Sequence, residues 1–294
     1  MLSWFIEPLG FEFMRNAILM AMLLGILCAV VGSYLIVQGM GLLGDVISHA
    51  VLPGLAIAFF FGVDIFLGAF ISGTLSSFVI AWIQSQSKVK VDVAMAMVFS
   101  GFLALGIVLI TLLGSKLDLH SILFGDVLGV TTTDVIRTGA IATFVLFMVK
   151  LFYKELLFYT FDPLGAQAMG LPVNLMHFGL TAAITLTIIA SMQAVGVVLV
   201  VSLLIGPGIT AYLLVKELHQ MMLLGAISGV ISSVSGMYIS YYLNVPSGAS
   251  IVLVVSGLFL LALLLSPTQG ILTRPEIANR SGMMLRQLTY LKRR

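Results

Sequence analysis

The sequence predicts an all-α protein, a polytopic membrane helix bundle with about nine transmembrane helices. Two observations support this prediction. Of the 294 residues, 60% are hydrophobic and only 9% are charged, whereas about 25% of the residues in a soluble domain are charged. The mean hydropathy is +1.17, and the apolar residues form runs long enough to cross a hydrocarbon core of about 30 Å. Such a low charge content argues against a nucleic-acid-binding surface.

The apolar runs define the spans in order, with eight spans as the alternative count. We place them at residues 14–37, 44–62, 65–85, 93–114, 132–154, 174–192, 195–215, 221–243 and 248–266. Residues 1–13 carry two glutamates and no positive charge, so we expect a short interfacial segment there rather than a cleavable signal peptide. The chain then divides into this segment, a transmembrane domain at 14–266 and a basic cytoplasmic tail at 267–294.

Lysine and arginine are distributed unevenly between the two sides of these spans. If the N-terminus lies outside, eleven of the fourteen basic residues fall on the inner side, as the positive-inside rule requires. The eleven are Lys88, Lys90, Lys150, Lys154, Lys216, Arg274, Arg280, Arg286, Lys292, Arg293 and Arg294. The asymmetry therefore predicts an N-terminus outside, a C-terminus in the cytoplasm and an odd number of spans.

Motifs for catalysis and nucleotide binding are absent from the sequence. It contains no GxxxxGK[ST] loop, no HExxH and no GxSxG, so we predict neither an enzyme nor a nucleotide site in this chain. The single cysteine, Cys28, lies in an apolar run, which excludes an internal disulfide and predicts a buried side chain. We expect His120 and His219 to be solvated or interfacial, and His177 to snorkel or cap at a span end.

The stretch GLLGDVISHAVLPG, residues 41–54, places Asp45 and His49 at the head of a predicted span. Ionisable residues inside a membrane are costly and usually functional. Four residues apart on a helix, the two side chains share one face and can converge on one point. A carboxylate and an imidazole suit manganese, iron or zinc, and a two-ligand site would release its metal readily. The alternative is structural, with Asp45 capping the helix and accepting a hydrogen bond from His49.

Two of the loops between the predicted spans are each expected to contain a short helix. Residues 115–134 are half apolar, so we expect a short helix lying at the outer face. Residues 162–170, on the inner side, have the signals of a complete short helix. These signals are Asp162 as the N-cap, Pro163 as the first residue, Ala166 in the middle and Gly170 in the stop. Such a helix is too short to be stable alone, so we expect it to dock onto a partner; a plain surface connector is the alternative.

Four motifs, in order, resemble the permease subunits of metal-cation ABC importers, a family that takes up manganese, zinc or ferrous iron. The motifs are GDVISHAVLPG, LHSILFGDVLGV, FDPLGAQAMGLPV and VGVVLVVSLLIGPGITA, and the resemblance covers about residues 14–266. It implies a homodimeric permease in the bacterial plasma membrane that binds two cytoplasmic ATPase subunits. The ATPase subunits would hydrolyse ATP, and an extracytoplasmic metal-binding protein would deliver the metal.

The resemblance also implies roles for particular residues. Asp45 and His49 would be transient metal ligands, with no cofactor bound permanently. Residues 162–170 would be the coupling helix that contacts the ATPase, and residues 119–130 would form the outer gate.

The identity of the metal depends on a second position. Zinc-type members often carry a further histidine in the fourth span, but here that region contains Phe99 and Ser100. This difference favours manganese over zinc or iron.

A gradient-driven secondary transporter or channel is the competing function class. Such a carrier usually needs its own proton or sodium site within the membrane, often on repeated, broken helices. Here Asp64, Asp92 and Asp134 fall at predicted span ends, and we find no internal repeat. The sequence therefore favours a permease driven by a partner ATPase.

Overall fold

The computed structural model describes residues 7–113, 125, 127–266 and 270, and every structural statement below concerns these residues. Within them the chain is all helical, as the sequence predicts. The helices are η1 (Pro8–Gly10), α2 (Glu12–Val37), α3 (Leu43–Ala50), α4 (Leu52–Phe61), α5 (Ile65–Gln86), α6 (Val91–Leu112), η2 (Val127–Gly129), α8 (Thr132–Leu151), α9 (Tyr153–Phe161), α10 (Pro163–Ala168), α11 (Val173–Val195), α12 (Val197–Leu214), α13 (Leu218–Leu243) and α14 (Ser247–Leu265).

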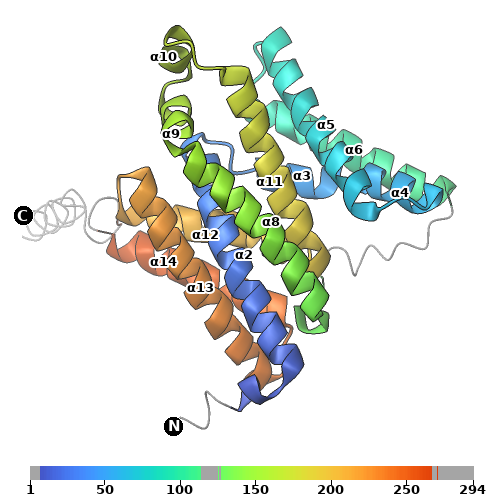
Figure 1. The fold of residues 1–294 in the computed structure, drawn as a ribbon, viewed down its shortest axis with the longest axis vertical. Helices are drawn as coiled ribbons and strands as arrows, with labels where there is room; N and C mark the ends of the chain where they lie inside the picture. Colours follow the sequence, from blue (N-terminus) through green and yellow to red (C-terminus); the bar gives the residue numbers. More distant parts are fainter. Residues whose placement is uncertain (1–6, 114–124, 126, 267–269, 271–294) are drawn as a thin grey trace, which may run out of the picture.

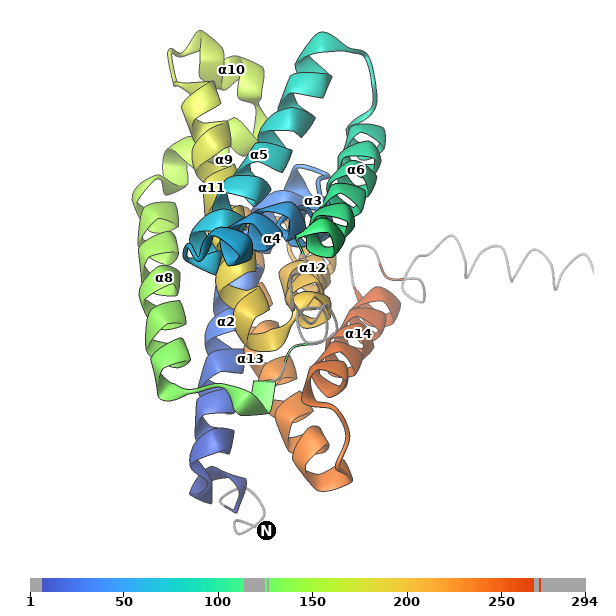
Figure 2. The same ribbon diagram turned by 90° about the vertical axis from the view of Figure 1, so that its right-hand side faces the viewer.

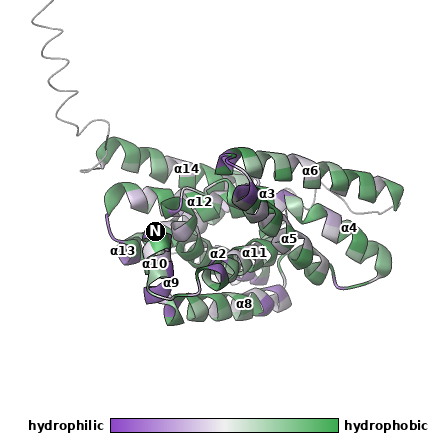
Figure 3. Ribbon diagram, turned by 90° about the horizontal axis from the view of Figure 1, so that it is seen from above, coloured by the Kyte–Doolittle hydropathy of each residue, from purple (hydrophilic) through white to green (hydrophobic). Residues whose placement is uncertain are grey.

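The number of spans agrees with the prediction. Among the described residues, eight helices are long and apolar enough to cross a membrane, or nine if α8 and α9 count as one bent span. Large apolar side chains cover their outward faces, and Leu253, Ile136 and Met97 are 73%, 68% and 67% exposed. Hydrophobic residues predominate along α4, α6 and α14 (Figure 3). An exposed apolar surface of this extent is suited to lipid rather than water.

Two predicted spans differ from the observed helices. The span predicted at 44–62 is present as one span, Leu43–Phe61, in which a single turn residue, Val51, lies between α3 and α4. Pro53 lies in the first turn of α4, where it has no N–H with which to continue the hydrogen-bond pattern of α3. The span predicted at 132–154 is wrong at its inner end, because α8 stops at Leu151 and the chain turns by 72° into α9.

Helix α9 (Tyr153–Phe161) is a separate element that the local sequence does not indicate. No glycine or proline lies between α8 and α9. Instead, the buried side chains of Leu156, Tyr159 and Thr160 hold α9 where it contacts α2 and α11. Tertiary packing, which the local sequence does not encode, turns the chain here.

The helices form two groups joined by α11. Helix α2 packs against α12 and α13, and α14 packs on those two helices, while α3 to α6 pack against one another. Helix α11 contacts α3 and α5 on one side and α2, α8 and α12 on the other, and Figures 1 and 2 show it between the two groups.

Glycines bring helix backbones into direct contact at two places. A Cβ added to Gly25 would lie 2.8 Å from the carbonyl carbon of Gly229, and one added to Gly54 would lie 2.0 Å from the carbonyl oxygen of Gly68. Larger residues would separate these helices, because small residues are what allow close helix approach in lipid.

The ends of the bundle are distinguishable. Helix α10 and the connection between α5 and α6 lie at one end, and the described N-terminal helix begins at the other (Figure 2). Residues 88–90 and 162–170 are thus on the same side, as the predicted topology requires. That this side faces the cytoplasm remains a prediction. Most of the tail at 267–294, part of the segment 1–13 and most of the loop 115–134, His120 included, lie outside the described residues.

Candidate functional site

The predicted metal pair lies on α3, a helix of only eight residues (Leu43–Ala50). A short connection leads into it from α2, and its first part turns at Gly39, which has a φ of +69°. Helix α3 contacts α5, α6, α11 and α12, so it lies where the two groups of helices meet. Its other residues are buried, and Asp45 and His49 mark its less buried face.

Asp45 and His49 are in contact, as their spacing predicts. The Nδ1 atom of His49 lies 3.5 Å from Oδ1 of Asp45, and the two side chains are 19% and 43% exposed, respectively. The same Nδ1 lies 3.0 Å from the backbone carbonyl oxygen of Asp45. When Nδ1 carries the proton and donates it to that carbonyl, the lone pair on Nε2 is left free for a metal ion.

The structural alternative for this pair is only partly seen. The N-cap of α3 is Leu42, without a side-chain cap, so Asp45 does not cap the helix. Asp45 lies in the first helical turn instead, where the helix dipole favours a carboxylate. The contact with His49 is present, but the capping role that would make Asp45 purely structural is absent.

The residue expected to distinguish zinc-type from manganese-type sites lies beside the pair. The Phe99 ring of α6 packs edge-on against the His49 ring, with 4.9 Å between the ring centroids. The hydroxyl of Ser100 donates to the carbonyl of Ala96 in its own helix at 2.9 Å. The α6 side chain that packs on His49 is therefore an aromatic hydrocarbon with no metal-ligating atom.

The remaining ionisable residues do not add to this site. Among the described residues, no group of three or more His, Cys, Asp or Glu side chains could hold a metal ion. Asp64 is the N-cap of α5, and Asp92 and Asp134 lie in the first turns of α6 and α8, as the sequence predicts for span ends. These three aspartates therefore lie at the starts of helices rather than within them.

Of the other two described histidines, His219 lies where the sequence predicts and His177 does not. His219 is exposed and contacts Glu217 at 3.2 Å, in line with a solvated position. The prediction for His177 is wrong: it lies in the second turn of α11 and is hydrogen-bonded through Nδ1 to the hydroxyl of Tyr159 at 3.0 Å. Residues far apart in sequence make this contact, so spacing alone gives no sign of it.

The predicted short helix is present as α10 and is slightly shorter than expected. Oδ1 of Asp162 accepts a hydrogen bond from the backbone N–H of Gly165 at 2.8 Å, which confirms the cap. Gly170 has a φ of +82°, as a stop requires. Ala166 is fully buried, so α10 packs more closely on its own chain than the sequence suggests. Leu164 and Met169 remain 79% and 76% exposed.

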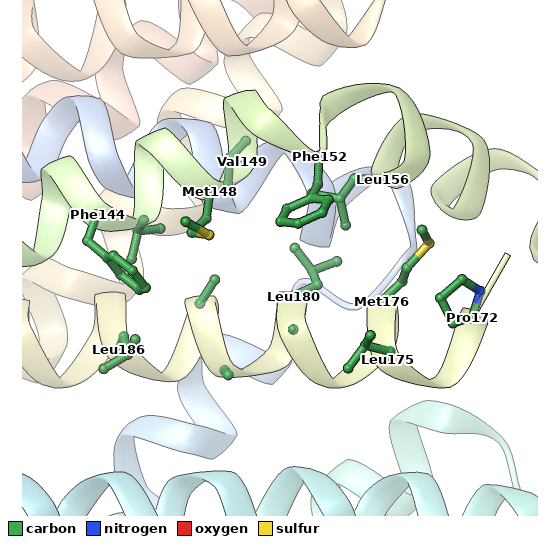
Figure 4. A pocket seen from close by; sticks show the side chains of 14 residues that line it. Phe144, Met148, Val149, Phe152, Leu156, Pro172, Leu175, Met176, Leu180 and Leu186 are labelled. Carbon is green, nitrogen blue, oxygen red and sulfur yellow. The ribbon is translucent and has the colours of Figure 1, made fainter.

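A large apolar groove between α8 and α11 is not part of the metal site. It encloses about 410 Å³, and Figure 4 shows Phe144, Met148 and Phe152 facing Leu180 and Met176 across it. Its lining contains no carboxylate and no imidazole, so it offers a borderline divalent metal none of its usual oxygen or nitrogen ligands.

Comparisons with known proteins fit this arrangement. The model of the ABC 3 transport family matches residues 10–266. The manganese transport system membrane protein MntC of Halalkalibacterium halodurans is 48% identical over 272 residues, which cover 92% of this chain and 93% of that protein. The probable iron transport system membrane protein of Haemophilus influenzae is 41% identical over 263 residues, which cover 90% of this chain and 97% of that protein.

A solved structure also matches along most of the chain. PsaBC from Streptococcus pneumoniae in complex with Fab contains a chain with a TM-score of 0.82 and 42% sequence identity. The match covers 92% of the present chain and 98% of that chain. Both the sequence and the fold are therefore shared over nearly their whole length.

Proposed function

The chain belongs to the ABC 3 transport family, as its four motifs indicate, and on this premise we propose that it is the permease of an importer that carries manganese into the cytoplasm. A separate ATPase subunit would supply the energy, because the sequence has no phosphate-binding loop. The relative from Halalkalibacterium halodurans is named a manganese transport protein. Ferrous iron is the second candidate, since the relative from Haemophilus influenzae is named for iron transport.

The observation that carries the proposal is the contact between Asp45 and His49. The two side chains offer one hard oxygen ligand and one imidazole nitrogen on a half-open face at the centre of the molecule. Such a mixed set suits a borderline divalent ion such as manganese. Two ligands hold an ion weakly, and a conduction pathway needs sites that release their ions. Phe99 beside His49 keeps the set at two, which favours manganese over zinc.

We further propose the partners and the location that family membership implies. A second copy of the chain would complete the pathway, and two ATPase subunits would bind at the α10 end, where Leu164 and Met169 offer exposed apolar side chains. An extracytoplasmic binding protein would deliver the metal from the opposite side. The transmembrane unit, residues 14–266, would lie in the inner membrane of a bacterium.

The experiment compares metal accumulation in cells that lack this protein and are restored with wild type, Asp45→Asn or His49→Gln. We expect both variants to reduce accumulated manganese to the level of the empty strain, while membrane abundance stays normal because neither change adds a charge to a span. Ser48→Ala on the same helix is the control, since the Ser48 hydroxyl donates only to the carbonyl of Gly44. Normal accumulation in both ligand variants would reject the metal role.

A further inference from the structure

Helix α9, which follows the bend after α8, makes two hydrogen bonds to distant parts of the chain. The Tyr159 hydroxyl lies 3.0 Å from Nδ1 of His177 on α11. The side-chain amide of Gln38, at the end of α2, donates to the Thr160 hydroxyl oxygen at 3.3 Å. Tyr159 and Thr160 are only 7% and 8% exposed, so neither hydroxyl could exchange its partner for water without cost.

Tyr159 and Thr160, which make these two hydrogen bonds, lie next to the predicted coupling helix in the sequence. Thr160 lies two residues before Asp162, the N-cap of α10. The backbone N–H of Asp162 donates to the carbonyl of Phe158 at 2.9 Å, so Asp162 is both the C-cap of α9 and the N-cap of α10. Helices α9 and α10 also contact each other. A displacement of α10 would therefore carry Tyr159 and Thr160 with it.

Gln38 and His177, the partners of these two hydrogen bonds, lie close to the start of α3, the helix that bears the proposed metal pair. Gln38 is the C-cap of α2, and only residues 39–42 separate it from Leu43, the first residue of α3. His177 lines a small cavity of about 20 Å³ together with Met40 and Leu43. This volume is enough for about one water molecule, so the start of α3 has a little free space beside it.

We propose that Gln38, Tyr159, Thr160 and His177, here called the α9 linkage, transmit movement of α10 to α3 and so open and close access to the metal pair. The proposal rests on the proposed function, because it assumes an ATPase that acts on α10. The two hydrogen bonds start from neighbouring residues of α9. The bond of Thr160 reaches the end of α2, and the bond of Tyr159 reaches α11; these two segments lie beside the start of α3. A linkage of this kind would move α3 without rearranging the long spans around it.

A static fastening is the alternative, since proximity alone does not establish a coupling route. The two can be separated because a fastening affects how much complex forms, whereas a coupling element affects how much metal moves for each ATP hydrolysed. Tyr159→Phe combined with Thr160→Val removes both hydroxyls of α9 with almost no change in side-chain size. The complex of this chain with its ATPase is reconstituted in vesicles, and manganese import, ATP hydrolysis and bound ATPase are measured together.

We expect the double variant to keep its ATPase and its rate of hydrolysis but to import about tenfold less manganese per ATP, within the 5–150-fold range typical of coupling between sites. Thr143→Val is the matched control, because the Thr143 hydroxyl donates only to the carbonyl of Gly139 within α8. The control should import as wild type does.

Gln38→Met provides an independent test from the α2 side of the linkage, and decides the matter if the double variant fails to assemble. Unchanged import per ATP in Gln38→Met, or in an assembled double variant, would overturn the proposal. Failure of the wild-type complex to import manganese would instead refute the proposed function.

Discussion

Replacing Ala166 with proline tests whether α10 couples the permease to its ATPase. Ala166 donates its backbone N–H to the carbonyl of Asp162 at 3.0 Å and is fully buried. Proline removes that bond and clashes with the preceding turn, at a cost of about 3 kcal/mol or more. Its extra ring atoms would overpack a buried site, which typically costs about 1–3 kcal/mol more. A helix of six residues has no comparable stability of its own to lose, so α10 should unfold.

The assay follows manganese uptake in cells, membrane abundance and co-purification of the ATPase. We expect manganese uptake at background, normal membrane abundance, and manganese binding retained at Asp45 and His49. The last two follow because, among the described helices, α10 packs mainly against α9 and α11 and not against α3. Ala166→Gly is the graded control: it keeps the N–H, adds no atom and costs about 1 kcal/mol. Assembly and wild-type uptake by Ala166→Pro would refute the coupling role, and the loop at residues 215–220 would be the next surface to test.

Two further predictions concern topology and metal choice. Reporter fusions at Ser87 and at Arg294 should both report the cytoplasm, because eleven of fourteen basic residues fall on that side; an extracytoplasmic signal at either position would break the predicted topology. Phe99→His should raise zinc binding relative to manganese, measured by metal analysis of the purified protein, because the ring at this position already packs against that of His49, a proposed ligand. An unchanged metal ratio would show that position 99 does not select the metal.

The long spans could be predicted because their signal is local. Each is a continuous apolar run, and the observed helices begin and end within a few residues of the runs at most places. The predicted signals for the two ends of the short helix are also confirmed. Asp162 caps the start of α10, and Gly170 turns the chain after its end. Composition and capping chemistry are properties of neighbouring residues, which a single sequence contains in full.

The bend between α8 and α9 could not be predicted in this way. Residues 138–149 form one uncharged run, and no proline or glycine follows it before Phe152. The turn of 72° between α8 and α9 arises from packing of α9 against distant helices. The hydrogen bond of His177 could not be predicted for the same reason, because its partner Tyr159 lies on another helix. Which helices meet is information that the periodicity of one segment does not carry.

The candidate site shows the same division between local and distant information. The pairing of Asp45 with His49 follows from their spacing on a helix. The position of Phe99 against His49 could be anticipated only through resemblance to a family, since it requires α6 to lie beside α3. The one-residue break at Val51 within the span Leu43–Phe61 is signalled locally by Pro53, two residues later.

That break bears on how a metal could be bound and then released. An eight-residue helix is marginal by itself, so α3 depends on its contacts with α4, α5, α6, α11 and α12. Val51 lies between it and α4, whose second residue is Pro53, and Gly39 turns the connection from α2. The two proposed ligands therefore lie on a short element between Gly39 and Val51, while the close glycine contacts elsewhere keep the long helices together. A weak pair of proposed metal ligands on such a short helix would be suited to passing an ion onward rather than storing it.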